Sequence, residues 1–469
     1  MIVAIEAYVK ELASKKCVGL FYYAGHGVQV QWKNYMLPVD AEIDTVDDVQ
    51  KRAVEVNSLM AGLTRAANPL NVIILDACRD NPFGTAKPTQ AKGLSQMDAP
   101  TNTILAYATS PGNVASDGEG ANGLYTENLL REIKVPEAKI EDVFKRVRLG
   151  VRRKSNGAQI PWESTSLEED FWFIPPKEIK ASSDAEKDKQ FEEELALWEK
   201  VNASTAPAPL EDFLRRYPSG RFSELAQLQL DQALAKQGEK RIEIASSAGN
   251  PFSQGTFRAD LSYKVKDSYT YRVLDLESKQ EIRTFTDVVS EIREGEVLFA
   301  GGLILDRLGN TIQLPDGRRY TPRQDQPLEF AIGRKWATRY SVTRQGGGSD
   351  SEMEFRISRK EKITVPAGSF DCFVIEGEGS GISVSGAKLE LRMTRWMAPD
   401  KVRRPIVSEI FRKARIERGG PGGNAGQGPE TSYRGAAQKG RGFAGTGRKG
   451  PIERVQQSER IELVSYKQS

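Results

Sequence analysis

The first 175 residues of the chain alternate between short apolar runs and segments with helical spacing. Apolar runs of this length are typical of strands that are buried on both faces of a sheet. We expect strands at Val18–Ala24, Asn71–Ala77, Thr103–Thr109 and Phe171–Ile174, a short hairpin at Tyr35–Asp40, and helices near Ile2–Leu12, Val56–Ala66, Leu124–Ile133 and Ile140–Lys154. This alternation predicts an α/β domain over residues 1–175, with a mostly parallel sheet flanked by helices.

The pattern changes in the remaining residues. Residues 176–245 are rich in Lys, Glu, Asp and Ala, and they predict a helical linker with a pair of helices that resembles a tetratricopeptide repeat. Residues 255–417 alternate apolar and polar positions in short runs, which predicts a β-rich antiparallel accessory domain, a curved sheet or a barrel. Residues 418–455 are rich in Gly, Arg and Lys and predict a disordered segment, and residues 456–469 predict a C-terminal strand.

Composition excludes several classes of partner. The formal charge is +3, from 67 basic and 64 acidic residues, which is too small to indicate a nucleic-acid partner. The Gly- and Arg-rich segment offers only Tyr433 and Phe443 for stacking on bases. No apolar run reaches the roughly 18–20 residues that span a bilayer, so we expect no membrane span. The sequence leaves the cytoplasm and the periplasm open as locations.

The metal-ligating residue types are few and scattered. The chain has one histidine, His26, and three cysteines, Cys17, Cys78 and Cys372. A zinc site needs about four ligands with short spacings between them, and a disulfide framework needs paired, clustered cysteines. No Gly-containing acidic loop matches a calcium site. We therefore expect no metal and no cofactor.

His26 and Cys78 occupy equivalent positions in the predicted sheet. His26 follows the first apolar run and precedes Gly27, and Cys78 follows the second run. Open α/β sheets place their sites outside the carboxyl ends of their strands, so the two side chains are expected to meet there. A cysteine beside a histidine can perform nucleophilic catalysis. The alternative is that Cys78 is a small hydrophobic residue at the end of a buried strand.

The two motifs resemble those of caspase-like cysteine peptidases, and more closely their bacterial and metacaspase-type relatives. The resemblance rests on the residues 23–27, Tyr-Ala-Gly-His-Gly, and 76–80, Asp-Ala-Cys-Arg-Asp, and it covers roughly residues 1–175. It implies that Cys78 is the nucleophile of a thioester acyl-enzyme and that His26 is the acid and base. It also implies that the backbone N–H groups of Gly27 and Cys78 hold the oxyanion.

The resemblance also implies a substrate class. Caspases present Gln and Arg to an acidic side chain, whereas this sequence has Asp76 two residues before Cys78, and Asp117 in the loop that resembles the one completing the pocket. Two carboxylates suit a guanidinium or an ammonium, so we expect cleavage of peptide or protein substrates after Arg or Lys. The alternative is that Asp76 binds a neighbouring loop and Asp117 is a turn residue. Gly123–Thr126 resembles the start of the small-subunit part of the family, and we expect it to be a packing element with no catalytic role.

The start of the chain departs from the family pattern. Caspase-like domains begin with a strand, a helix and a second strand, whereas Met1 opens directly on the helix before the His26 strand. Loss of one interior strand forfeits about 10–18 kcal/mol of gross apolar burial, which is comparable to the net stability of a domain, about 5–15 kcal/mol. We expect that the natural start lies upstream, or that the gene is a fragment. The alternative to the bacterial endopeptidase is therefore a truncated, inactive scaffold that binds proteins through its helical and β-rich segments.

Overall fold

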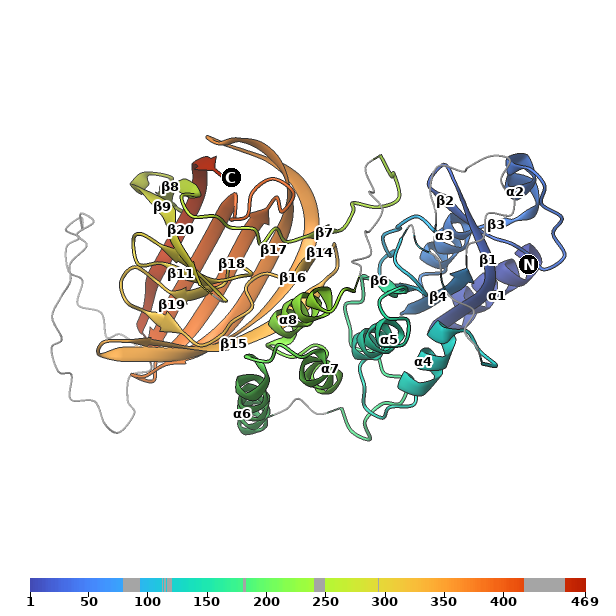
Figure 1. The fold of residues 1–469 in the computed structure, drawn as a ribbon, viewed down its shortest axis with the longest axis horizontal. Coiled ribbons are helices and arrows are strands. Elements are labelled where there is room, and N and C mark those ends of the chain that lie inside the picture. Colours follow the sequence, from blue (N-terminus) through green and yellow to red (C-terminus); the bar gives the residue numbers. More distant parts are fainter. Residues whose placement is uncertain are drawn as a thin grey trace, which may run out of the picture.

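The computed structural model shows two β-sheet domains with a group of helices between them (Figure 1). Residues 1–172 contain a sheet flanked by helices, and the second half of the chain contains a barrel. The structure describes residues 1–78, 93–111, 113, 115, 120–179, 183–239, 249–293, 295–416 and 452–469, without the side chains of Cys78 and Asp184.

The N-terminal domain is built on one six-stranded sheet, in the order β3-β2-β1-β4-β5-β6. The strands β1, β4 and β5 are parallel, and the pairs β1–β2, β2–β3 and β5–β6 are antiparallel. The elements are α1 (Ile2–Lys15), β1 (Gly19–Val30), β2 (Lys33–Met36), α2 (Val46–Arg52), β3 (Val54–Glu55), α3 (Val56–Ala66), β4 (Asn71–Cys78), β5 (Thr103–Tyr107), α4 (Leu124–Glu132), α5 (Ile140–Lys154) and β6 (Trp162–Thr165).

The sheet is therefore mixed, and the expectation of a mostly parallel sheet holds only for its centre. One cause is the two-residue turn between β1 and β2, in which Gln31 and Trp32 both have positive φ, 51° and 69°. Turns of this kind match the twist of an antiparallel hairpin, so β2 folds back on β1.

The expected strand at Phe171–Ile174 is wrong. This segment forms only an isolated bridge between Trp172 and Lys139. Phe171 and Phe173 instead pack edge to face, with ring centroids 5.5 Å apart, against the core beneath α4 and α5. The aromatic run therefore covers the core, and the edge strand of the sheet is β6.

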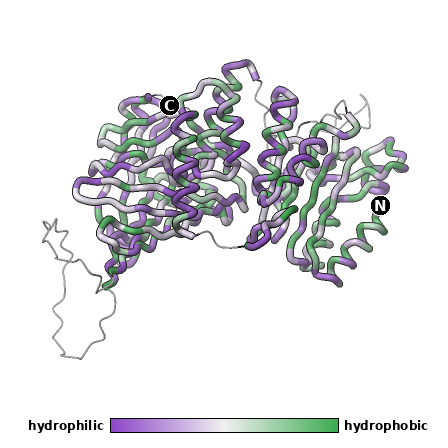
Figure 2. The backbone as a smooth tube through the Cα atoms, turned by 90° about the horizontal axis from the view of Figure 1, so that it is seen from below, coloured by the Kyte–Doolittle hydropathy of each residue, from purple (hydrophilic) through white to green (hydrophobic). Residues whose placement is uncertain are grey.

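Apolar side chains cover both faces of the central strands. In β4, Ile73 and Leu75 face a core that includes side chains of α1 and α3, while Val72 and Ile74 face a second core beneath α4 and α5. All four residues are at most 3 % exposed. In Figure 2 the hydrophobic colour is concentrated on this sheet. The buried strand fixes the register on which the site depends.

Part of β1 has less cover than the rest of the sheet. Residues Gly19–His26 pair with β4 on one side, whereas pairing with β2 on the other side begins only at Gly27. Val18, Leu20 and Tyr22 are 43, 49 and 42 % exposed. Among the described residues, no strand pairs with this edge of β1, so apolar surface and open backbone lie next to each other.

Three helices lie between the domains: α6 (Asp184–Val201), α7 (Pro207–Arg216) and α8 (Ser223–Lys236). A capping box starts α6, because the Ser183 hydroxyl accepts from the Glu186 N–H and the Glu186 carboxylate accepts from the Ser183 N–H. Trp198, Phe213 and Phe222 form the aromatic centre of the group, which also buries Leu149 of α5. The helices thus pack on the N-terminal domain through α5.

The C-terminal domain confirms the β-rich prediction and is a closed antiparallel barrel. Strand β20, near the end of the chain, pairs with β8 and closes it. The barrel strands are β8 (Ser268–Asp275), β9 (Glu281–Arg293), β10 (Glu296–Phe299), β11 (Ile304–Asp306), β12 (Thr311–Gln313), β13 (Arg319–Tyr320), β15 (Lys335–Arg344), β16 (Gly347–Val365), β17 (Gly368–Ser383), β18 (Lys388–Met397), β19 (Val407–Ile416) and β20 (Ile452–Lys467). Two short strands, β7 (Phe257–Arg258) and β14 (Glu329–Phe330), pair with each other.

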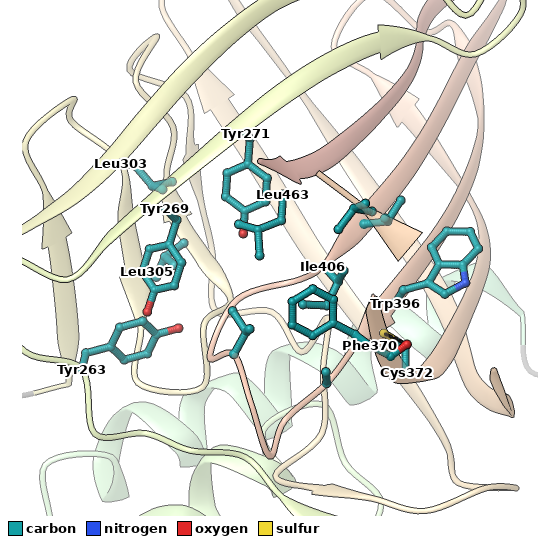
Figure 3. Close-up of a cluster of buried hydrophobic side chains, with 14 of the residues drawn as sticks. Tyr263, Tyr269, Tyr271, Leu303, Leu305, Phe370, Cys372, Trp396, Ile406 and Leu463 are labelled. Carbon is teal, nitrogen blue, oxygen red and sulfur yellow. Dashed lines mark hydrogen bonds between the residues drawn. The ribbon is translucent and has the colours of Figure 1, made fainter. Parts of the chain in front are cut away.

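The barrel core joins strands that are far apart in the sequence. In Figure 3, Tyr269 and Tyr271 of β8 lie near Leu463 of β20, in a cluster that also contains Cys372 of β17. The Gly-rich segment predicted at 418–455 lies outside the described residues except for its last four, which begin β20.

Ion pairs and hydrogen bonds join the two domains. Arg152 of α5 contacts Asp231 of α8 at 2.6 Å and Glu239 at 2.7 Å. On the barrel side, Arg148 contacts Glu329 at 3.4 Å and Lys335 donates to the Leu167 carbonyl at 2.5 Å. Helix α5 therefore belongs to the core of one domain on one face and to the interdomain contact on the other.

Arg152→Ala is expected to lower the free energy of unfolding by about 3 kcal/mol, because Glu239 loses its mostly buried partner and Asp231 keeps only its contacts with Arg258 and Gln227. Urea denaturation followed by circular dichroism would measure the change. Lys154→Ala, which breaks an exposed pair with Glu127, is the control and should cost less than about 1 kcal/mol. Equal effects of the two substitutions would contradict this account of the contact.

Candidate active site

The parallel pairing of β1 and β4 places His26 opposite Cys78. The paired residues of the two strands run from Gly19 opposite Asn71 to His26 opposite Cys78, seven positions later in each strand. Neighbouring strands lie about 4.8 Å apart, so two backbones in this register hold their residues as neighbours. The side chain of Cys78 and the whole of Asp117 lie outside the described part of the chain.

His26 lies where β1 changes partner. The strand does not end at Ala24, as the apolar run predicted, but continues through His26 to Val30, pairing with β4 up to His26 and with β2 from Gly27. The His26 residue is exposed, so its imidazole is accessible from solvent.

Tyr23 fixes the backbone at His26. Its hydroxyl donates to the His26 carbonyl at 2.7 Å and shares that proton with the Leu37 carbonyl at 2.9 Å, while the Leu37 N–H donates to the His26 carbonyl at 3.0 Å. Burial raises the pKa of Tyr23 to about 12, so the hydroxyl keeps its proton at neutral pH. The hairpin and β1 are thus held together at the proposed catalytic residue.

Gly27 occupies a position where a side chain would crowd its neighbours. A Cβ atom there would lie 2.9 Å from Leu94 Cδ2 and 3.1 Å from Ala77 Cβ. Any other residue would displace Leu94 or the end of β4. The structure thus gives a packing reason for glycine at 27, beside its proposed role in binding the oxyanion.

Asp76 lies two residues before Cys78 and takes part in a cluster of hydroxyl groups. Its Oδ2 accepts from Thr126 Oγ1 at 2.5 Å and from the Tyr22 hydroxyl at 3.4 Å, and the two hydroxyl oxygens are 2.6 Å apart. Sequence reasoning assigned Thr126 to packing and passed over Tyr22. The alternation of side chains along a strand could have indicated this contact. Ala24 lies directly opposite Asp76 in the register, and Tyr22, two residues before Ala24, points to the same face of the sheet as Asp76.

A cavity of about 670 Å³ lies near the end of β5, between the N-terminal domain and the C-terminal half of the chain. Its charged lining consists of Lys145, Arg148, Arg152, Glu163, Glu224, Asp231, Glu239, Arg258, Asp260, Glu329 and Arg334. Arg148, Arg152 and Arg334 make ion pairs there with acidic residues of α8, β14 and Glu239. The cavity is a charged joint between domains and contains neither His26 nor Asp76.

Two other kinds of site are absent from the described residues. No group of three or more His, Cys, Asp or Glu side chains in them is arranged to hold a metal ion. No helix in the same part of the chain is long and apolar enough to cross a membrane.

Comparison with known proteins identifies the N-terminal domain. Residues 1–172 match the family model of the caspase domain. This domain is therefore caspase-like, as its motifs suggested.

Two curated relatives also match. They are mucosa-associated lymphoid tissue lymphoma translocation protein 1 from Homo sapiens and its homolog from Mus musculus, each 29 % identical over 132 residues. The match covers 26 % of this chain and 15 % of each relative, so the chain spans a small part of their length.

Two solved structures resemble the chain weakly. One is a candidate exported protein with a YmcC-like fold from Bacteroides fragilis, 10 % identical with a TM-score of 0.21, and the other is a candidate lipoprotein from Parabacteroides distasonis, 9 % identical with a TM-score of 0.25. Each match covers 45 % of this chain and all of the other.

Tyr23→Phe is expected to lower the free energy of unfolding by about 1–2 kcal/mol, because the His26 and Leu37 carbonyls lose a donor. Tyr8→Phe is the matched control, since the Tyr8 hydroxyl is buried without a hydrogen-bond partner among the described residues. That substitution should be neutral or stabilising. Chemical denaturation of both variants checks the pair, and a larger cost for Tyr8→Phe would refute the assignment.

Proposed function

We propose that the caspase-like domain is a cysteine endopeptidase in which Cys78 is the nucleophile and His26 the acid and base. The observation that carries the proposal is the register of β1 and β4, which sets these two residues opposite each other in a domain of the caspase family. The alternative of Cys78 as an inert core residue does not explain why the single histidine of the chain is its partner in the ladder.

The proposed reaction forms and breaks a thioester. Free cysteine thiols have a pKa of about 8.5 and are only a few per cent thiolate at pH 7, so Cys78 needs an imidazole to move its proton. Attack of the sulfur on the scissile carbonyl forms a C–S bond, and His26 protonates the leaving amine as the C–N bond breaks. Water, deprotonated by His26, then attacks the thioester carbonyl to form a C–O bond. The C–S bond breaks, the acid product leaves, and the Cys78 sulfur takes back the proton from His26. The backbone N–H groups of Gly27 and Cys78 would stabilise the oxyanion in both steps.

We propose cleavage after Arg or Lys. The Asp76 carboxylate supports this preference, because it lies two residues before Cys78 in β4 and points to the face of the sheet that carries Tyr22. An ionised carboxylate attracts a guanidinium or ammonium and repels an acidic side chain. Asp117 is proposed as the second acidic residue of the pocket on the sequence resemblance alone.

A second candidate function is a catalytically inactive interaction module. The open edge of β1 favours it, because exposed backbone groups and the apolar side chains of Val18, Leu20 and Tyr22 offer a surface on which another strand could pair. In this alternative the caspase-like domain binds a protein and performs no hydrolysis.

Hydrolysis of matched fluorogenic peptides ending in Arg, Lys or Asp distinguishes the two functions. We expect the full chain to cleave the Arg and Lys peptides and to leave the Asp peptide intact. Cys78→Ala and His26→Ala should each lower kcat/KM at least about 10³-fold, because nucleophile and base act as a unit. Cys372→Ala, which removes a cysteine buried in the barrel, is the control and should keep the activity. A folded chain that cleaves none of the peptides would favour the interaction module.

A further inference from the structure

Three elements that are far apart in the sequence bring polar groups together beside the proposed nucleophile. Tyr22 belongs to β1, Asp76 to β4 and Thr126 to the first turn of α4. Tyr22 and Ile74 are Cα partners, so Tyr22 and Asp76 are diagonal neighbours on the same face of the sheet. The three side chains meet above that face, two residues from the end of β4.

The direction of the hydrogen bonds follows from the chemistry of the groups. An ionised carboxylate only accepts, so the Thr126 hydroxyl donates to Asp76 Oδ2 across 2.5 Å. Because Thr126 has then used its proton, the Tyr22 hydroxyl directs its single proton mainly to Thr126 Oγ1 across 2.6 Å, and Asp76 Oδ2 is a weaker second acceptor at 3.4 Å. Two hydroxyl groups in series therefore end on one carboxylate oxygen and hold it in one orientation.

Thr126 is anchored on a rigid element. Its neighbour Tyr125 is 1 % exposed and packs in the core beneath α4 and α5. Asn128 of the same helix donates to the Leu124 carbonyl and contacts Arg131, closing the first turns of α4. The amino end of a helix also favours negative charge, which further stabilises the Asp76 carboxylate at this position.

Tyr22, at the other end of this series of hydrogen bonds, is exposed to solvent. Tyr22 is 42 % exposed, and the Tyr22 oxygen that donates to Thr126 keeps lone pairs with which it can accept. A cation that approaches Asp76 from the Tyr22 side would therefore meet a fixed carboxylate and a hydroxyl oxygen together.

We propose that Thr126 and Tyr22 are positioning residues for a basic substrate side chain: they hold the Asp76 carboxylate in the orientation that receives the Arg or Lys cation. The proposal rests on the proposed function. It assigns a role in recognition to a segment that sequence reasoning gave only to packing. A purely structural role, in which Thr126 ties α4 to the sheet, makes different predictions for substrate affinity.

The test uses the full chain with Thr126→Val, which removes the donor and keeps the shape of the side chain. We expect kcat/KM for Arg and Lys peptides to fall about tenfold, mainly through KM, because one hydrogen bond to a charged group is lost. Thr126→Ser restores the donor and should recover kcat/KM to within about twofold. Tyr22→Phe should raise KM in the same direction and by less.

Thr64→Val is the matched control. The Thr64 hydroxyl donates to the Met60 carbonyl at 2.9 Å on the exposed surface of α3, so the same chemical change is made away from Asp76. This variant should keep the KM of the unsubstituted chain. A Thr126→Val variant with unchanged KM for basic peptides, whether or not it unfolds more easily, would overturn the proposal and leave the proposed peptidase function standing.

Binding of benzamidine, a small amidinium cation, separates recognition from catalysis. Calorimetric titration of Cys78→Ala measures this binding without turnover, and addition of Thr126→Val should weaken it about tenfold. If no peptide is cleaved but this difference is found, the peptidase function fails and the positioning role holds. If Cys78→Ala does not bind benzamidine, or binds it equally with and without Thr126→Val, the positioning role is refuted.

Discussion

The pairing of β1 with β4 is the interaction on which the proposed site depends. Its register is specified by burial, because Ile73 and Leu75 face one core while Val72 and Ile74 face the other. A slip of one residue would turn each of these side chains to the wrong face of the sheet. The same register sets His26 opposite Cys78 and directs Asp76 toward Tyr22. Apolar burial at a distance from the site therefore sets its chemistry.

The C-terminal half of the chain also packs on the caspase-like domain, close to the proposed site. Phe252, which follows the helical segment, packs against the core of the caspase-like domain, and Asp98 accepts from the Ser253 hydroxyl and the Gln254 N–H. The segment that carries Asp98 also carries Leu94, which contacts the position of Gly27. The barrel and its linker are therefore packed on the peptidase-like domain through defined contacts, including the charged joint at α5.

The sequence predicted the features that local patterns encode. The apolar runs located β4 and β5, and the strand-end rule together with the family motifs led to the expectation that His26 and Cys78 are neighbours, which agrees with their Cα pairing. The continuation of β1 past His26 was missed because residues 27–30 mix glycine and glutamine with valine. The antiparallel edges of the sheet and the contact between Thr126 and Asp76 join residues that are distant in sequence, and no local pattern specifies such contacts. The strand predicted at Phe171–Ile174 was wrong because these residues have the aromatic composition of a strand, whereas in the structure Phe171 and Phe173 cover a core.

Alkylation by a peptidyl-arginine chloromethyl ketone, with the modified residue located by mass spectrometry, tests the central claim most directly. Cys17 is exposed and is the natural target of indiscriminate alkylation, whereas Cys372 is buried and burial raises the pKa of its thiol to about 12. A site formed by His26 and Cys78 with an acidic pocket predicts one equivalent of label on Cys78 while Cys17 stays free. Label on Cys17 at a rate equal to or higher than that on Cys78 would contradict the account.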